Sequence, residues 1–263
     1  MSIEETKLAA IAGDKISQYQ IGYAYLHGSD GLDQNLPEAV KWFQASADQG
    51  HVEAQLELGN AYFTGAGAGL DVAIAFKLYV KAAEQGSADA QNNVGAMYGK
   101  GVGIDLNYEE AVKWLKLAAR QGHHIAQNSL GLCYLYGNGV KKDLDEALFW
   151  ISASADGPLG GYIEAQFNLG QCYMGSCLWG YPNEAIEATV NGASAIQWFS
   201  KAAGRGHTEA QFELGKILLS SGVFKRSSSE INEGLKWLKM ASDNGHLRAV
   251  EIVKRHLSNS TRG

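Results

Sequence analysis

The chain is built from one sequence pattern that recurs six times in phase, with a period of about 36 residues. In residues 51–86 the pattern reads A-Q-x-x-L-G-x-x-Y, then a glycine-bearing loop, an Ala with Leu three positions later, and A-A-x-x-G. The mid-motif glycine sets the register and stands at Gly22, Gly59, Gly95, Gly131, Gly170 and Gly215, at intervals of 37, 36, 36, 39 and 45 residues. Such a period predicts an array of stacked structural units.

Other positions keep a fixed distance from this glycine. Four residues before it lie Gln18, Gln55, Gln91, Gln127, Gln166 and Gln211. Three residues after it lie Tyr25, Tyr62, Tyr98, Tyr134, Tyr173 and Leu218. Later in each unit come Trp42, Leu78, Trp114, Trp150, Trp198 and Trp237. Chance does not produce six such registers.

Each unit is predicted to contain two antiparallel helices joined by a loop. In residues 51–64, Ala54, Leu58 and Tyr62 are four apart, which is the spacing of a helical stripe. A mid-helix glycine costs roughly 1 kcal/mol relative to Ala. Close helix–helix approach compensates for this cost, with the second-helix aromatic position filling the remaining volume. Each unit leaves an apolar face open, so neighbouring units must stack.

This pattern resembles Sel-1-like repeats, which are relatives of tetratricopeptide repeats, and the resemblance extends from about residue 13 to 257. It implies an all-α fold, a right-handed α/α superhelical solenoid of about six helix-pair repeats with partial capping units. We expect a single repeat domain over 1–263, with a partial unit at 1–14, repeats at 15–50, 51–86, 87–122, 123–157, 162–206 and 207–245, a capping helix at 246–257 and a tail at 258–263.

Composition argues against several classes of partner. The net charge of −6 and pI near 5.7 provide no basic stripe, so we expect no nucleic acid. No run of 18 apolar residues occurs, so we expect no membrane insertion. Three cysteines and no visible signal peptide indicate a cytoplasmic monomer, or a periplasmic one if a signal has been removed.

No catalytic or metal-binding motif is visible. The chain lacks Ser-x-x-Lys, G-x-S-x-G and H-E-x-x-H. One repeat position carries His51, His123, His207 and His246, and repeat spacing would hold them about 10 Å apart, too far to share an ion. We interpret them as turn residues, the six glutamines as partners of inter-helix backbone groups, and Cys133, Cys172 and Cys177 as free, small apolar side chains. We expect neither enzymatic activity nor a cofactor.

The remaining candidate site is a stripe on the first helices, which line the concave groove in tetratricopeptide-like solenoids. The stripe consists of Tyr19, Tyr23, Asn60, Phe63, Asn92, Asn128, Tyr136, Phe167, Gln171, Phe212 and Lys216. Amides that bond a main chain, mixed with rings that contact side chains, suit peptide capture. The alternative is that some of these residues pack against the next unit.

An insert within residues 175–194 carries Trp179 and Tyr181, outside the repeat register. These aromatics form a second contact site, or the insert folds back into a gap between units. Both readings stay open.

We therefore expect a non-enzymatic scaffold or adaptor that binds a protein or peptide in its concave groove. The resemblance implies bacterial signalling, secretion-system or host-interaction adaptors. The alternative is a toxin-neutralising immunity protein. A hydrolase of the β-lactam or cell-wall type, as in cysteine-rich relatives, is less favoured because Ser-x-x-Lys is missing.

Overall fold

The computed structural model describes residues 2–178 and 180–260, and every regular element in these ranges is a helix. This confirms the predicted all-α solenoid of helix-pair repeats. The elements are α1 (Ile3–Ile11), α2 (Lys15–His27), α3 (Leu36–Asp48), α4 (Val52–Thr64), α5 (Val72–Glu84), α6 (Ala88–Lys100), α7 (Tyr108–Arg120), α8 (His124–Tyr136), α9 (Leu144–Ala155), the 3-10 helix η1 (Pro158–Gly160), α10 (Ile163–Tyr173), α11 (Asn183–Thr189), α12 (Gly192–Gly204), α13 (Thr208–Lys225), α14 (Ser228–Asp243) and α15 (Leu247–Ser260).

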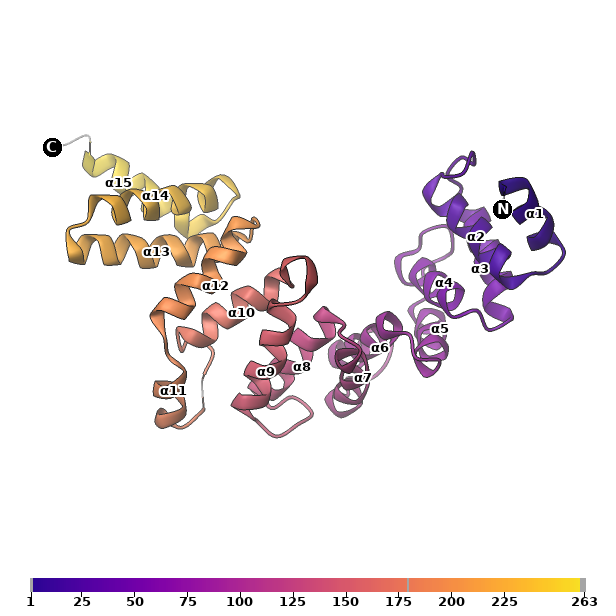
Figure 1. Ribbon diagram of the computed structural model, residues 1–263, viewed down its shortest axis with the longest axis horizontal. Helices are drawn as coiled ribbons and strands as arrows, with labels where there is room; N and C mark the ends of the chain where they lie inside the picture. The colour runs from indigo at the N-terminus through magenta and orange to yellow at the C-terminus, as the bar shows by residue number, and fades with distance from the viewer. Residues whose placement is uncertain (1, 179, 261–263) are drawn as a thin grey trace. The chain divides into compact units, whose positions relative to one another are not determined.

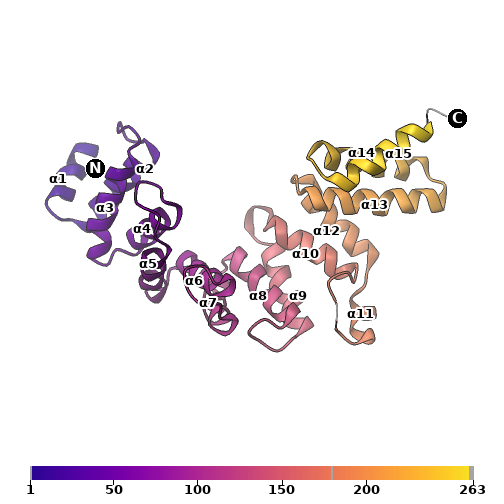
Figure 2. The same cartoon turned by 180° about the vertical axis from the view of Figure 1, so that it is seen from behind.

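The chain divides into two compact units, unit 1 at residues 1–142 and unit 2 at residues 143–263. In unit 1 each helix from α1 to α8 packs on the next one along the chain (Figure 1). In unit 2 the order of contacts is α9, α10, α12, α13, α14 and α15, and the last three lie side by side in both views (Figures 1 and 2). The single domain over 1–263 stays a prediction.

Local chemistry at the helix ends explains why the pairs form. Second helices begin where an Asn, Asp or, for α14, Ser side chain accepts a hydrogen bond from a backbone N–H of the first turn, as Asn107 does from Glu110 at 3.0 Å. In unit 1 the first helices end on glycine in the left-handed region, for example Gly101 with φ of 64°. These signals recur at the repeat period, so the helix pair recurs with them.

The repeat glycines are sites of close helix–helix approach, as predicted. A Cβ placed on Gly59 would lie 2.7 Å from the Tyr79 ring, and one on Gly170 would lie 2.5 Å from the Phe199 ring. Neither distance is tolerable for real atoms, so a side chain at these positions would push the helices apart.

The aromatic position assigned to this contact was wrong by one residue. Phe199 faces the glycine, whereas its predecessor Trp198 is only half-buried. Because successive helical residues are about 100° apart, the tryptophan position points to another neighbour. Trp114 packs on the core formed by α5 and α6, and Trp237 packs on the core of α12 and α13. These two tryptophans therefore join consecutive repeats.

Among the described residues, no helix is both long enough and apolar enough to cross a membrane.

Candidate interaction surface

The six repeat glutamines are structural. Each is buried and donates its Nε2 to a carbonyl near the end of a preceding helix. The acceptors are Ala10, Ala47, Ala83, Ala119, Ala155 and Ala203, at 3.1, 3.3, 3.0, 3.2, 3.2 and 3.2 Å. Except at Ala155, each of these carbonyls also accepts a backbone N–H from the glycine three residues later, so the glutamine occupies the second lone pair of the oxygen. The interpretation of the glutamines as partners of backbone groups is confirmed.

The repeat histidines cap the first helices. Their Nδ1 atoms accept hydrogen bonds from the N–H groups of Ala54, Ala126, Ala210 and Ala249, at 3.3, 3.1, 3.1 and 3.2 Å. A nitrogen that accepts carries no proton, so the ring presents Nε2–H. In three repeats this Nε2 lies 3.0–3.1 Å from a carboxylate of the preceding first helix, that of Asp89, Glu164 or Glu209. The turn interpretation is confirmed, and no group of three metal-ligating side chains occurs among the described residues.

Part of the predicted stripe stacks on these histidines. Ring centroids lie 4.9 Å apart for Tyr19 and His51, 4.5 Å for Phe167 and His207, and 4.0 Å for Phe212 and His246. Phe212 and Asn128 are buried, with exposures of 2% and 6%. The three stacked residues pack against the next repeat, as the alternative interpretation predicted. Phe212 and Asn128 are buried and so are not accessible to a partner.

Other stripe residues are dispersed. Tyr23 and Tyr136 are exposed, and Asn92 is half-buried. Gln171 accepts a hydrogen bond from the Ser176 hydroxyl, so its amide is engaged in the turn after α10. Within the insert, Tyr181 is half-buried and burial raises its pKa, while Trp179 lies outside the described residues. A partner-binding role for each of these residues stays a prediction.

Three hollows lie between consecutive first helices and share the same repeat positions. One wall of each hollow contains the residue four positions after the repeat glycine of the earlier first helix. The other wall comes from the later first helix and contains the residues two before, one after, two after and five after its own repeat glycine. Between α2 and α4 these are Leu26, Glu57, Asn60, Ala61 and Thr64; between α4 and α6, Phe63, Asn93, Ala96, Met97 and Lys100; between α10 and α13, Met174, Glu213, Lys216, Ile217 and Ser220. Their volumes are about 110, 290 and 540 Å³.

The α4–α6 hollow has an ordered floor and a polar rim. The Tyr79 hydroxyl donates to Asn60 Oδ1 at 2.8 Å, and burial raises the pKa of Tyr79 to about 12, so the hydroxyl stays neutral. Met97 is buried beneath, and the Phe63 ring is partly exposed. Lys100 is exposed and forms no ion pair within the described part of the chain. The hollow can therefore hold an apolar side chain beside an anionic group.

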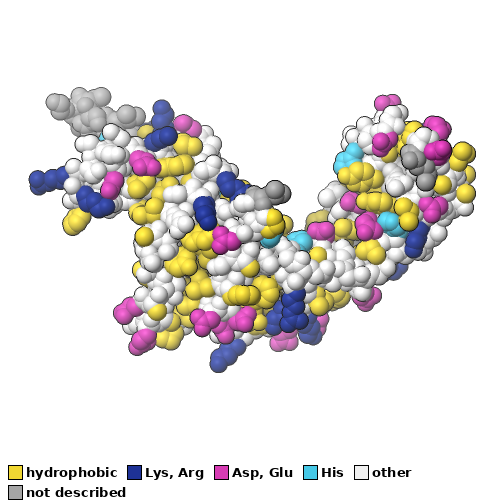
Figure 3. Space-filling view, viewed as in Figure 1, with side chains coloured by type: hydrophobic (Ala, Val, Ile, Leu, Met, Phe, Trp, Pro, Cys, Tyr) yellow, Lys and Arg dark blue, Asp and Glu magenta, His cyan; other side chains and the backbone are white. Residues whose placement is uncertain are grey.

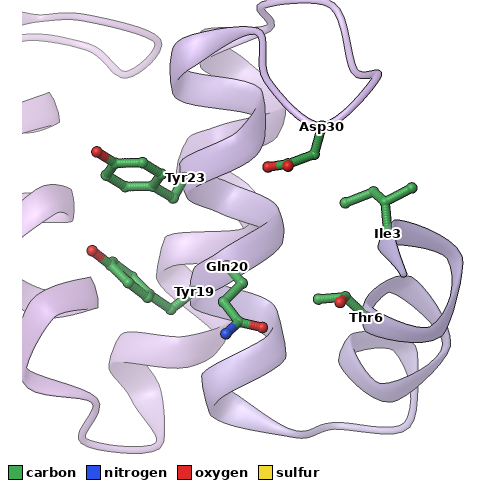
Figure 4. Close-up of a pocket in the computed structure, with 6 residues that line it drawn as sticks. All are labelled: Ile3, Thr6, Tyr19, Gln20, Tyr23 and Asp30. Atoms are coloured by element: carbon green, nitrogen blue, oxygen red, sulfur yellow. The ribbon is translucent and has the colours of Figure 1, made fainter. Parts of the chain in front are cut away.

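A further hollow of about 440 Å³ lies between α1 and α2, where Ile3, Thr6, Gln20 and Asp30 face one another (Figure 4). The rings of Tyr19 and Tyr23, which also line it, project from the side of α2 away from α1 (Figure 4). It does not use the repeat positions of the other three hollows.

Three residues that line the α4–α6 hollow, Asn93, Met97 and Lys100, are absent from the predicted stripe. Their spacing of four and three residues places them on one helix face and was the available signal.

On the face shown in Figure 3, acidic and basic side chains are interspersed.

The repeats of this chain are similar to repeats in known proteins. The family model described as the Sel1 repeat matches residues 15–51, 52–87, 88–123, 124–158, 163–176, 184–207 and 208–246. Among solved structures, a Sel1 repeat protein from Oxalobacter formigenes is 32% identical with a TM-score of 0.73, over 87% of this chain and 85% of that one. No curated protein matches the chain.

Two other solved structures are similar over most of this chain. A protective antigen of uropathogenic Escherichia coli strains, displaying an SLR fold, is 29% identical with a TM-score of 0.68. The match covers 96% of this chain but only 58% of the antigen. An immunity protein from Pseudomonas aeruginosa is 24% identical over 89% of this chain and 81% of that protein, with a TM-score of 0.48.

Proposed function

The chain belongs to the Sel1 repeat family, and we propose that it binds a protein or peptide in the hollows between the first helices of consecutive repeats. Sel1 repeat proteins are generally non-catalytic interaction scaffolds. The observation that carries the proposal is the recurrence of the hollow at the same repeat positions in both units.

Some hollow residues, such as Met97 and Leu26, also pack in the core, but the hydrogen bonds and ring stacking that link the repeats use other positions. Contacts between repeats use the glutamine, the histidine, the residue three before the glycine, and the tryptophan. Partly exposed apolar side chains such as Phe63 and Met174 remain beside open volume in the hollows. Apolar surface that serves no internal contact is typical of a binding site.

The spacing of the hollows suits an extended ligand. The α2–α4 and α4–α6 hollows share Asn60, so they are adjacent in unit 1. Packed helices are about 10 Å apart, and three residues of a polyproline II segment span about 9 Å. A peptide in that conformation would present apolar side chains at positions i and i+3 to the two hollows.

The test combines substitutions in the α4–α6 hollow with affinity capture and quantitative mass spectrometry. Replacing Phe63, Asn93 and Lys100 together by Ala should reduce retention of the captured partner at least tenfold, because anchor residues carry most binding energy. Leu117→Ala is the matched control, since Leu117 is exposed but lies on the second helix α7. Unchanged retention by a folded triple variant would contradict the proposal.

A toxin-neutralising immunity protein would be a special case of the same binding activity. It would use the hollows to occupy a toxin, and the triple variant would then fail to protect cells that express that toxin. A chain that binds a partner without protecting any cell would instead act as an adaptor.

A further inference from the structure

The turn after α10 folds the chain back over the last turn of that helix. Gly175 has φ of 74°, and its N–H donates to the Cys172 carbonyl at 2.9 Å. The Ser176 N–H donates to the Gln171 carbonyl at 3.1 Å. This pair of hydrogen bonds is the Schellman arrangement, which ends a helix with a residue in the left-handed region. The following residue, Cys177, is thereby directed towards the helix.

The turn brings two thiols together. Cys172 and Cys177 are both free, and their Sγ atoms lie 3.0 Å apart, within S–H···S hydrogen-bond distance. On a continuous helix, side chains five residues apart would point to different sides, but α10 ends at Tyr173. The interpretation of these cysteines as free thiols is confirmed. Cys172 is buried and Cys177 is partly exposed.

We propose that Cys172 and Cys177 form a dithiol site that exchanges with a low-molecular-weight disulfide and closes into an intramolecular disulfide. The inference is independent of the proposed binding function. It rests on the distance between the sulfurs, on the unequal exposure of the two thiols, and on a turn that holds both in place.

The two cysteines have different roles. Hydrogen bonding with Cys172 lowers the pKa of Cys177, whereas the same hydrogen bond and burial raise the pKa of Cys172. The exposed thiol is thus the better nucleophile at neutral pH, since thiolates and not thiols attack disulfides. Cys177 reacts first, and Cys172 resolves the product.

The reaction balances with oxidised glutathione as the oxidant. The Cys177 thiolate attacks one glutathione sulfur, forming a mixed disulfide and releasing one glutathione thiolate. Cys172 then loses its proton to solvent and attacks Cys177 Sγ, releasing the second glutathione thiolate. The protein loses two hydrogen atoms, and the two electrons pass to the two glutathione molecules.

The site adjoins the surface proposed to bind a partner. Met174 lies between the two cysteines in the chain and lines the α10–α13 hollow. A disulfide between residues 172 and 177 would fix the turn that presents Met174. Oxidation state would then influence how rigidly this wall of the hollow is held.

Cys133 provides a control within the same chain. It lies in α8 of unit 1, and burial raises its pKa to about 11. Its thiol is therefore protonated at neutral pH and a weak nucleophile.

The experiment exposes the folded full chain to excess oxidised glutathione and follows intact mass and peptide maps. The unsubstituted protein should lose two hydrogen atoms from the peptide that carries Cys172 and Cys177, and dithiothreitol should reverse the change. Cys172→Ser should instead keep one glutathione on Cys177, and Cys177→Ser should leave Cys172 unmodified. Cys133→Ser should behave like the parent.

Either of two results on the unsubstituted protein would overturn the proposal, whatever the stability of the variants. One is a stable glutathione adduct on Cys177 that never resolves. The other is modification of Cys133 as fast as Cys177, where we expect at least about a tenfold difference in rate.

Discussion

The α4–α6 hollow of unit 1 and the α10–α13 hollow of unit 2 use the same repeat positions but offer different chemistry. In unit 1 the lysine of the hollow, Lys100, has no ion-pair partner among the described residues. In unit 2, Lys216 is held by Glu213 at 2.9 Å and lies 4.9 Å from the Phe212 ring centroid. Repeat geometry thus fixes where a hollow forms, and the residues at its positions decide what it binds.

The two hollows also differ in their walls. Helices α4 and α6 each have 13 residues, whereas α13 has 18, and its additional turn contributes Phe224 to the lining of the hollow. Phe224 is 90% exposed. We therefore expect unit 1 to prefer an apolar side chain next to an anionic group, and unit 2 to prefer apolar surface.

The largest effect should follow from filling the close helix contact, which both units share. Gly95→Leu in unit 1 and Gly170→Leu in unit 2 should each lower the free energy of unfolding by about 3 kcal/mol, because the added side chain meets Leu115 or Phe199. Thermal unfolding followed by circular dichroism measures this. A variant as stable as the parent would show that the helix crossing is assigned incorrectly.

Gly99 in α6 is the matched control for this prediction. A Cβ there would lie 3.6 Å from Ala111 Cβ, an ordinary contact. Gly99→Ala should therefore leave stability unchanged or raise it by up to about 1 kcal/mol.

Charge reversal should separate the two hollows. Lys100→Glu should weaken partner retention about tenfold, because it turns an unpaired cation at the rim into an anion. Lys216→Glu should have a smaller effect, since its charge is already partly offset by Glu213. Quantitative affinity capture at two salt concentrations measures which substitution reduces partner retention more. An equal loss of retention in the two variants would contradict the proposed difference between the two hollows.

The His51 cap should make stability depend on pH. Burial lowers the pKa of His51 from its ordinary value of 6.5, despite the nearby Glu53. The unfolded chain then binds more protons than the folded one, so stability falls as pH drops below 6.5 and through the lowered pKa. Denaturant unfolding between pH 7.5 and about 5 measures the slope.

Ser87 supplies the matched substitution, because it occupies the same repeat position and its hydroxyl accepts the Ala90 N–H at 3.3 Å. His51→Ser should keep the cap and flatten this part of the pH dependence, whereas His51→Ala should cost about 1 kcal/mol at pH 7.5. An unchanged slope in His51→Ser would exclude His51 as its source.

The smallest effect on stability is expected at Phe224. Because its ring is almost fully exposed, Phe224→Ser should change the free energy of unfolding by less than about 0.5 kcal/mol. Retention of a partner that uses the unit 2 hollow should nevertheless fall. A large loss of stability would mean that Phe224 supports the fold.

The sequence was sufficient to predict the helix pairs and their close contacts. Caps, helix-ending glycines and the buried glutamine act locally, so their recurrence identifies each helix and its partner. The accessibility of the predicted stripe was harder to predict, because a helical wheel gives the direction of a side chain but not which neighbouring residues cover it. Phe212 lies on the predicted face, yet His246, which immediately precedes α15 in the chain, stacks over its ring.

The insert shows a second limit. The sequence pattern did not bring Cys172 and Cys177 together, because helical spacing no longer gives the direction of a side chain once the helix ends. Gly175 was the available signal, since a glycine just beyond a helix favours the reversal that brings residue 177 back.

The most direct test of the central claim is site-specific photo-crosslinking. A benzophenone amino acid in place of Phe63 puts the probe in the α4–α6 hollow, and the same probe at Leu117 puts it on an exposed second helix. The account predicts that position 63 cross-links the polypeptide retained in affinity capture and that position 117 does not. Equal cross-linking from both positions, or none from position 63, would contradict it.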